Sequence, residues 1–202
     1  MSEVELLVLH GLAVKKAGPA AAVADLLGHD EDEVSGALDL ATADGRALAA
    51  KGTFMLTPAG RSWIAEQYPQ VFAEFRASTL ASSAYARFEV INRELLTLFT
   101  DWQMIPASGG RVPNDHSDPE YDHRIIDRLG RQHERAQGPL EQFAELVGRL
   151  HRYIDRLEGA YDSVLAGHLD FVSGARVDSY HTVWFELHED LLRMLGRERE
   201  EQ

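Results

Sequence analysis

Apolar residues recur at helical spacing over the first 45 residues, where glycine and proline divide them into three segments. Residues 4–16 carry apolar side chains three and four positions apart, which predicts a helix. Pro19 suits the first turn of a second, short helix, and Gly28 can end that helix. Asp30 or Asp32 can cap a third helix. The buried side of this third helix is expected to consist of Val34, Ala37, Leu38 and Ala41.

Two short strand-like segments follow, at residues 47–51 and 53–57, on either side of Gly52. Pro58 then suits the first turn of another helix. Three helices, two short strands and a further helix form the order of a winged helix-turn-helix domain. We expect such a domain over residues 1–68.

The second strand segment and the start of the next helix read Phe-Met-Leu-Thr-Pro-Ala-Gly-Arg, from Phe54 to Arg61. This segment resembles the Leu-Thr-x-x-Gly-Arg wing of the MarR and PadR families of bacterial regulators. The resemblance covers roughly residues 1–68. It implies a domain that binds DNA and places its third helix in the major groove.

The rest of the chain, residues 69–202, is predicted to be an all-α bundle that serves dimerisation or ligand sensing. Helical stretches are expected at about residues 71–82 and 84–104, and another from Pro119 to about Ala136. Residues 105–119 are rich in proline, glycine, asparagine and aspartate, which predicts a loop. The expected fold class is therefore mainly α.

The strongest periodic pattern begins at Pro139, where apolar spacings of three and four alternate over four heptads. It predicts one helix from Pro139 to His168, about 40 Å long. The final helix is expected at residues 178–195, and residues 177–192 resemble the C-terminus of some uncharacterised actinobacterial proteins. The heptad seam consists of Leu140, Phe143, Val147, Leu150, Ile154, Leu157, Tyr161, Val164 and His168.

Composition narrows the class of protein. Hydrophobic residues make up 45% of the 202 residues and charged residues 26%, as in globular proteins. The absence of cysteine excludes disulfides, thiolate metal sites and a cysteine nucleophile. The N-terminus is acidic, unlike that of a signal peptide, and no apolar run approaches the roughly 18 residues of a membrane span. We therefore expect a cytoplasmic protein without a membrane partner.

Charge conflicts with the expected fold. The formal net charge is −13, and no Lys or Arg occurs from Ala17 to Gly45, the segment that should read DNA. Phosphate neutralisation by Lys and Arg supplies most non-specific DNA affinity, so fold and charge point to different functions. Any DNA contacts are expected from Lys15, Lys16, Ser35, Thr42, Arg46, Lys51 and Arg61.

Histidines and carboxylates gather after residue 114, which favours a ligand site in the C-terminal part. Asp122 and His133 fall on the apolar face of one predicted helix, where a charged group needs a partner. The alternative is that Asp122 stabilises the helix start and that His133 is a hydrogen-bonded core residue. The residues expected around a ligand are Trp102, Asp115, His116, Asp122, His133, Tyr161, His181, Trp184 and His188.

Neither a metal site nor a catalytic site is predicted. His181 and His188 lie seven residues apart, about 10 Å along a helix, which is too far for one metal ion. Their alternative role is a stripe at a second helix interface. The chain also lacks a P-loop and a Gly-x-Ser-x-Gly elbow.

Three functions are compatible with these patterns. The first is a homodimeric transcriptional regulator that binds double-stranded DNA and whose bundle senses a small-molecule effector. The second is a ligand- or protein-binding module whose acidic winged helix no longer binds DNA. The third is an enzyme or metal protein built around Asp115, His116, Asp122, His133 and the last helix.

Overall fold

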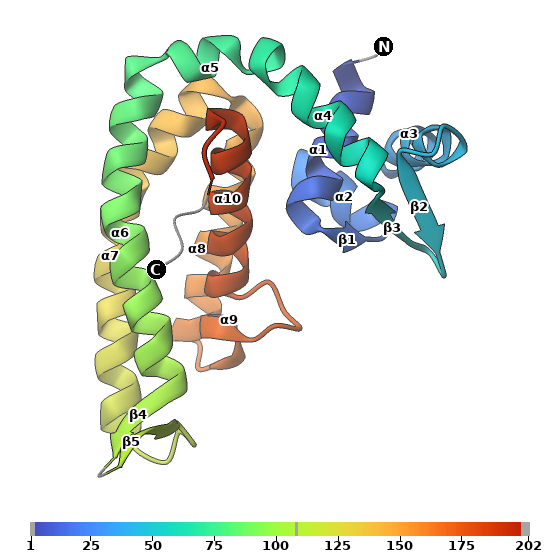
Figure 1. Ribbon diagram of the computed structural model, residues 1–202. Coiled ribbons are helices and arrows are strands. Elements are labelled where there is room, and N and C mark those ends of the chain that lie inside the picture. The colour runs from blue at the N-terminus through green and yellow to red at the C-terminus, as the bar shows by residue number, and fades with distance from the viewer. Residues whose placement is uncertain (1–2, 108, 199–202) are drawn as a thin grey trace. The chain divides into compact units, whose positions relative to one another are not determined.

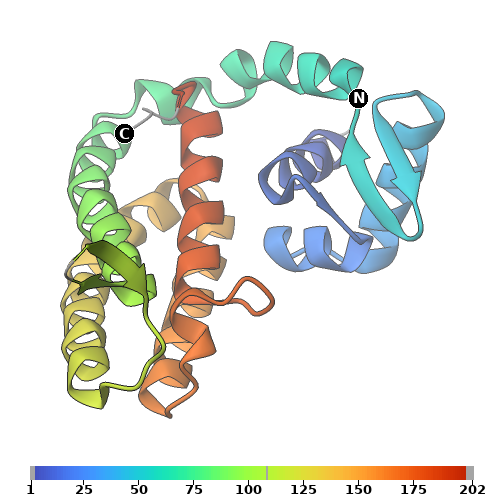
Figure 2. The ribbon, with the colours of Figure 1, turned by 60° about the horizontal axis from the view of Figure 1, so that its bottom comes forward.

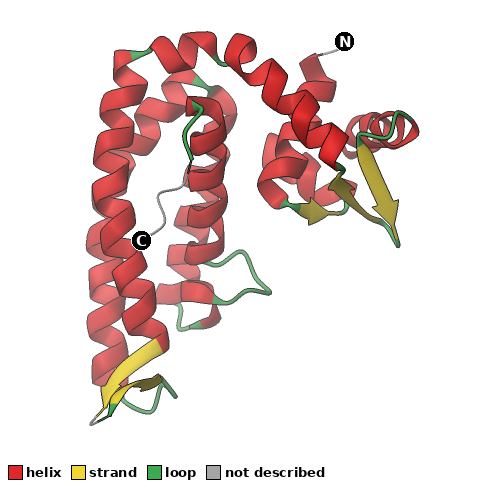
Figure 3. Ribbon diagram, in the orientation of Figure 1, coloured by secondary structure: helices red, strands yellow, loops and turns green. Residues whose placement is uncertain are grey.

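The computed structural model describes residues 3–107 and 109–198, and these residues are mainly helical (Figure 3). The chain forms two compact units. Unit 1 comprises residues 1–77 and 186–202, and unit 2 comprises residues 78–185. The predicted domain boundary between residues 68 and 69 lies inside a helix of unit 1. None of the described helices combines the length and the apolar character that crossing a membrane requires.

Unit 1 contains the helices and strands that the sequence predicts near its N-terminus (Figure 1). Gly28 ends the second helix with a φ of 72°, and the Asp30 side chain caps the third by accepting two backbone N–H groups. Thr57 caps the fourth helix, which starts at Pro58. The elements are α1 (Glu3–Lys15), β1 (Ala17–Gly18), α2 (Ala20–Leu27), α3 (Glu31–Ala43), β2 (Ala47–Ala50), β3 (Thr53–Leu56), α4 (Pro58–Val71) and α5 (Ala73–Ala77).

The three strands of unit 1 form an antiparallel sheet in the order β1-β3-β2. Ala47 lies opposite Leu56, and both are buried. Leu48 lies opposite Met55, and both are exposed, because successive side chains of a strand point to opposite faces. The sheet therefore has one face toward the core and one apolar pair in solvent.

At Gly60 the backbone of α4 approaches the base of the β2–β3 hairpin closely. A Cβ atom at this position would lie 2.0 Å from the backbone oxygen of Arg46, so only glycine fits. The Thr57 hydroxyl donates to the backbone oxygen of Gly45 at 2.7 Å, which holds the same junction. The Leu-Thr-x-x-Gly pattern thus has a local structural cause in this chain.

Unit 2 is built on two long helices that lie side by side in both Figure 1 and Figure 2 and are joined by a hairpin. A third helix returns along the second. The elements are α6 (Thr79–Gln103), β4 (Met104–Ala107), β5 (Gly110–Pro113), α7 (Pro119–Leu146), η1 (Gly148–Leu150), α8 (His151–Leu165) and α9 (Asp170–Ser173). α10 (Tyr180–Leu195) begins in unit 2 and continues in unit 1 from Glu186 onward.

The single helix predicted from Pro139 to His168 is wrong. Pro139 lies inside α7, and the chain breaks at Val147, whose extended backbone (φ −140°, ψ 94°) precedes Gly148. α8 then folds back on α7, so that Tyr161 reaches Gly130. Most residues of the predicted heptad seam are still buried, because the parts of the seam on α7 and on α8 pack against each other rather than against a separate long helix.

The loop predicted at residues 105–119 is also partly wrong, because its first half forms a hairpin. β4 and β5 pair antiparallel, with Ile105 opposite Val112. Proline is tolerated in such a ladder because neither strand has a second neighbour among the described residues. The remaining segment leads from Pro113 to the cap of α7 at Asp118.

Candidate functional site

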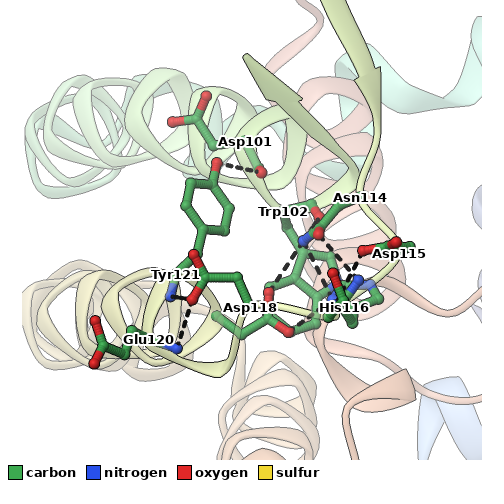
Figure 4. A network of polar contacts seen from close by, with 10 residues as sticks. Asp101, Trp102, Asn114, Asp115, His116, Asp118, Glu120 and Tyr121 are labelled. Carbon is green, nitrogen blue, oxygen red and sulfur yellow. Dashed lines mark hydrogen bonds and ion pairs between the residues drawn. The ribbon is translucent and has the colours of Figure 1, made fainter. Parts of the chain in front are cut away.

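The first candidate site lies in unit 2, where the end of α6, the segment after β5 and the start of α7 meet (Figure 4). The Asp118 carboxylate caps α7 by accepting the backbone N–H groups of Glu120 and Tyr121, both at 3.0 Å. This cap sets the direction of the first turn of α7. It thereby brings Asp122 toward the preceding loop.

Asp122 is buried and accepts hydrogen bonds on both carboxylate oxygens. The Asn114 side chain donates to Oδ1 at 3.0 Å, and Nδ1 of His116 lies 2.9 Å from Oδ2. The backbone N–H of His116 donates to the Asn114 side chain at 3.0 Å. The positive φ of His116, 58°, is held by these contacts.

The indole of Trp102 covers one side of this network. It is buried, and its ring centroid lies 4.5 Å from that of His116. The Asn114 side chain also donates to the backbone oxygen of Trp102 at 3.0 Å. The predicted residues Trp102, His116 and Asp122 are therefore brought together.

Asp115 is hydrogen-bonded by Ser117 rather than by His116 or Asn114. It is exposed, and hydrogen bonds from the side chain and backbone N–H of Ser117 hold the pKa of its carboxyl below the ordinary value. Asp115 thus stabilises the turn before α7. It does not join His116 and Asp122 as a third ligand.

Two arginines converge on Asp101 near the same end of α6. Arg128 and Arg111 contact its carboxylate at 2.8 and 2.9 Å. Partial burial raises the pKa of Asp101, but the two arginine hydrogen bonds outweigh it and leave the pKa below its ordinary value. The Tyr121 hydroxyl donates to the Asp101 backbone oxygen at 2.8 Å. These contacts fix the hairpin and α7 to α6.

The reactive group of this site is the imidazole of His116, which is held by the Asp122 carboxylate. The Asp122 carboxylate at Nδ1 orients the His116 ring, whose side chain is 34% exposed. No group of three His, Asp or Glu residues in the described parts of the chain could hold a metal ion. The contacts account for a structural clasp between α6 and α7.

The second group of predicted residues surrounds His133 on α7. Its ring stacks on Tyr161 with centroids 4.8 Å apart, and the Tyr180 hydroxyl lies 3.4 Å from its Nδ1. Gln137 contacts its Nε2 at 3.1 Å. Burial lowers the pKa of His133 even though Glu158, Asp162 and Glu134 raise it. His133 is therefore a half-buried, hydrogen-bonded histidine between α7, α8 and α10.

Trp184 belongs to this aromatic core rather than to an open pocket. Its ring lies between Phe88, 4.5 Å away, and Tyr180, 6.3 Å away, in nearly parallel planes. Its indole N–H donates to the Asn92 side chain at 3.0 Å. Trp184 is therefore buried among stacked rings.

The two histidines of α10 also occupy packed positions. His181 lies against Phe99, with ring centroids 4.5 Å apart, and burial lowers its pKa. His188, in the part of α10 that belongs to unit 1, is buried. Neither residue contributes to the clasp at His116.

The second candidate site is the surface of unit 1 that carries the predicted DNA contacts. Arg46 contacts the carboxylates of Glu5 and Asp44 and lies over the Trp63 ring, 4.7 Å from its centroid. Its side chain is only 14% exposed. Lys15 pairs with Glu186 at 2.8 Å and is equally buried. Both cations are therefore neutralised within unit 1.

The other basic residues among the predicted DNA contacts are more accessible. Lys16 and Lys51 are exposed and adopt positive φ values of 66° and 51°. Arg61 is exposed and donates to the backbone oxygen of Leu56. The Thr42 hydroxyl donates back to the oxygen of Leu38 in its own helix. Ser35 is half-buried on α3.

The outer side of α3 is acidic and carries an exposed leucine. Leu40 is 65% exposed, and Gly36 beside it has open space around its Cβ position. Asp32, Glu33 and Asp39 are exposed on the same helix. The sequence analysis did not predict a binding surface at these acidic residues and Leu40. Two sequence features could have indicated it: the absence of Lys and Arg from this helix, and a leucine on the side expected to face solvent.

A buried polar group in unit 1 was also not predicted. His10 lies 3.0 Å from the Tyr68 hydroxyl through Nδ1 and 2.8 Å from Asp190 through Nε2, and both His10 and Asp190 are fully buried. These residues come from α1, α4 and α10. No local pattern identifies such a contact, because His10 and Asp190 are far apart in the sequence.

Comparisons with protein-family models, with curated proteins and with solved structures found no match.

Proposed function

We propose that this chain is a regulatory binding protein whose winged helix recognises a protein rather than DNA. The order α1-β1-α2-α3-β2-β3 and the sheet order β1-β3-β2 support a winged helix over the N-terminal part of unit 1. In that arrangement α3 corresponds to the recognition helix and the β2–β3 hairpin to the wing. Because one fold can host unrelated functions, the choice between DNA and a protein as the partner must be argued from the surface residues of unit 1.

The observation that carries this proposal is the pairing of the basic residues. Arg46 is occupied by Glu5 and Asp44, and Lys15 by Glu186. DNA affinity depends on cations that neutralise phosphates and release counterions. A cation already paired with a partly buried carboxylate contributes little to that exchange, because the phosphate must compete with the carboxylate.

A DNA-binding regulator is the second candidate. The exposed Lys16, Lys51 and Arg61 favour it. Lys51 lies in the turn of the proposed wing, Lys16 precedes β1, which pairs with β3, and Arg61 on α4 donates to the backbone oxygen of Leu56 on β3. Their contacts would lie beside the sheet and would leave α3 away from the phosphates. A homodimer and a small-molecule effector remain predictions for either candidate.

A fluorescence anisotropy titration separates the two candidates. Labelled duplexes would comprise the DNA upstream of the gene and a mixed-sequence control, in about 50 mM salt, where electrostatic DNA binding is strong. We expect no saturable binding at about 10 µM protein, a concentration at which non-specific DNA binding is commonly detected. Binding that weakens steeply with salt would refute the proposal and favour the regulator.

A further inference from the structure

One side of α3 is exposed along its whole length. Its residues are spaced three and four apart, so they lie on one face of the helix. Leu40 lies between Gly36 and Ala43 on this face and is 65% exposed, the largest exposed fraction among the large apolar residues of the described chain. We define the α3 face as Asp32, Glu33, Gly36, Asp39, Leu40 and Ala43, all of which are exposed.

Between its acidic residues the α3 face is apolar, and its small side chains leave the helix backbone accessible. A Cβ atom at Gly36 would meet no other atom within 4 Å, so the helix backbone is accessible there. Gly36 and Ala43 flank Leu40 at four and three residues along the same face. A large apolar side chain of a partner can therefore lie against the backbone at Gly36 and contact Leu40 at the same time.

The border of the α3 face is negative. Asp32 and Asp39 lie along one edge, and no described basic side chain pairs with either of them. The Glu33 side chain is half exposed, and its carboxylate lies 3.2 Å from the His29 ring. Unpaired carboxylates beside an apolar strip attract Lys and Arg and repel phosphate.

A second copy of the chain does not suit this face. A twofold contact would place the same patch on both partners, and would bring Asp32 and Asp39 of one copy close to the acids of the other. Like charges in an interface are strongly unfavourable. A basic partner complements the face, and helices that present an apolar row are a common form of such partners.

We propose that the α3 face binds a basic amphipathic helix of another protein. An apolar residue of that helix lies against Gly36 and Leu40, and its Lys or Arg residues pair with Asp32 and Asp39. This inference rests on the proposed function and adds to it the chemistry and the location of the partner.

The test uses the full chain, labelled with ¹⁵N, and a synthetic amphipathic helix with leucine on one face and lysine on the other. A peptide of the same composition in scrambled order controls for charge alone. We expect the amphipathic peptide to shift the amide signals of residues 32–43 and to bind more tightly than the scrambled peptide. Equal binding of the two peptides, or shifts confined to other elements, would overturn the inference.

Paired variants then locate the contact. Asp39→Lys and Leu40→Ser should each weaken binding of the amphipathic peptide about tenfold, as for the loss of one good interface contact. Glu66→Lys and Val71→Ser, at exposed positions of α4, are the matched controls and should leave the affinity unchanged. Equal effects of both pairs would remove the α3 face as the binding site.

Failure of this inference can be told apart from failure of the proposed function. If the peptide does not bind and duplex DNA does not bind either, only the basic helix is excluded as the partner. If duplex DNA binds and shifts the signals of residues 32–43, both the inference and the proposed function are wrong.

Discussion

The guanidinium of Arg46 contacts the carboxylate of Glu5, and the two side chains are only 14% and 18% exposed. The pair joins α1 to the segment before β2, and Asp44 contacts the same Nη2 atom at 2.6 Å. A cation held in this way supports the fold of unit 1. It is therefore a poor donor for a phosphate, although its place in the sequence suggests one.

Replacing Arg46 should destabilise the protein more than replacing an exposed cation. Arg46→Ala leaves the carboxylate of Glu5 partly buried and without this ion pair, which should cost about 1–3 kcal/mol. Lys51→Ala, at the exposed tip of the hairpin, should cost less than about 0.5 kcal/mol. Urea unfolding followed by circular dichroism measures both. Equal midpoints for the two variants would show that Arg46 has no structural role.

The buried pair of His10 and Asp190 should be among the most sensitive contacts of unit 1. Asp190→Ala removes the partner of a fully buried imidazole, and the loss of one member of a buried pair costs about 3–5 kcal/mol. Tyr68→Phe removes only a hydroxyl next to the same ring and should cost about 1 kcal/mol. Thermal unfolding would contradict this ranking if Tyr68→Phe were the more damaging change.

Two histidines of unit 2 should make the protein less stable in acid. Burial lowers the pKa of both His133 and His181 in the folded state. Below about pH 6.5, the ordinary value for histidine, the unfolded chain takes up protons that the folded chain does not. Stability is therefore full above that pH and falls as the pH decreases toward the lowered pKa values.

The measurement is the melting temperature between about pH 7.5 and pH 5, a range that spans the ordinary pKa of histidine. The double variant His133→Gln/His181→Gln should melt at a lower temperature near neutral pH but lose less stability on acidification. A loss on acidification as large as that of the unchanged protein would exclude these histidines as its cause.

Two glycines of unit 1 should respond in opposite ways to alanine. Gly60→Ala places a Cβ atom 2.0 Å from the Arg46 backbone oxygen, so the hairpin and α4 must separate, and we expect a loss of about 3 kcal/mol or more. Gly36→Ala meets no atom within 4 Å inside an exposed helix and should gain about 0.5–1 kcal/mol. Chemical denaturation of the two variants checks both signs.

Local signals in the sequence predicted the elements of unit 1 well. The cap at Asp30, the left-handed Gly28 and the proline at position 58 each act on their own helix, so their effect can be read without tertiary information. The predicted heptad helix failed for the opposite reason. Apolar spacing shows which residues are buried but not what buries them, and a break at Val147 preserves the burial while reversing the chain.

The candidate sites could be predicted only in part. His116, Asp122 and Trp102 were each singled out, and the structure brings them together. Asn114, which donates to Asp122, was missed because asparagine in a loop gives no distinctive signal. The pairing of Lys15 with Glu186 could not be predicted at all, since it joins segments far apart in the chain.

We propose that unit 1 uses neither α3 nor its basic residues to bind DNA. The most direct test titrates the duplex upstream of the gene into the ¹⁵N-labelled full chain at low salt and follows the amide signals of residues 15–61. We predict no saturable shifts in α3 and none at Arg46. Saturable, salt-sensitive shifts along α3 and the β2–β3 hairpin would contradict the claim and identify the protein as a DNA-binding regulator.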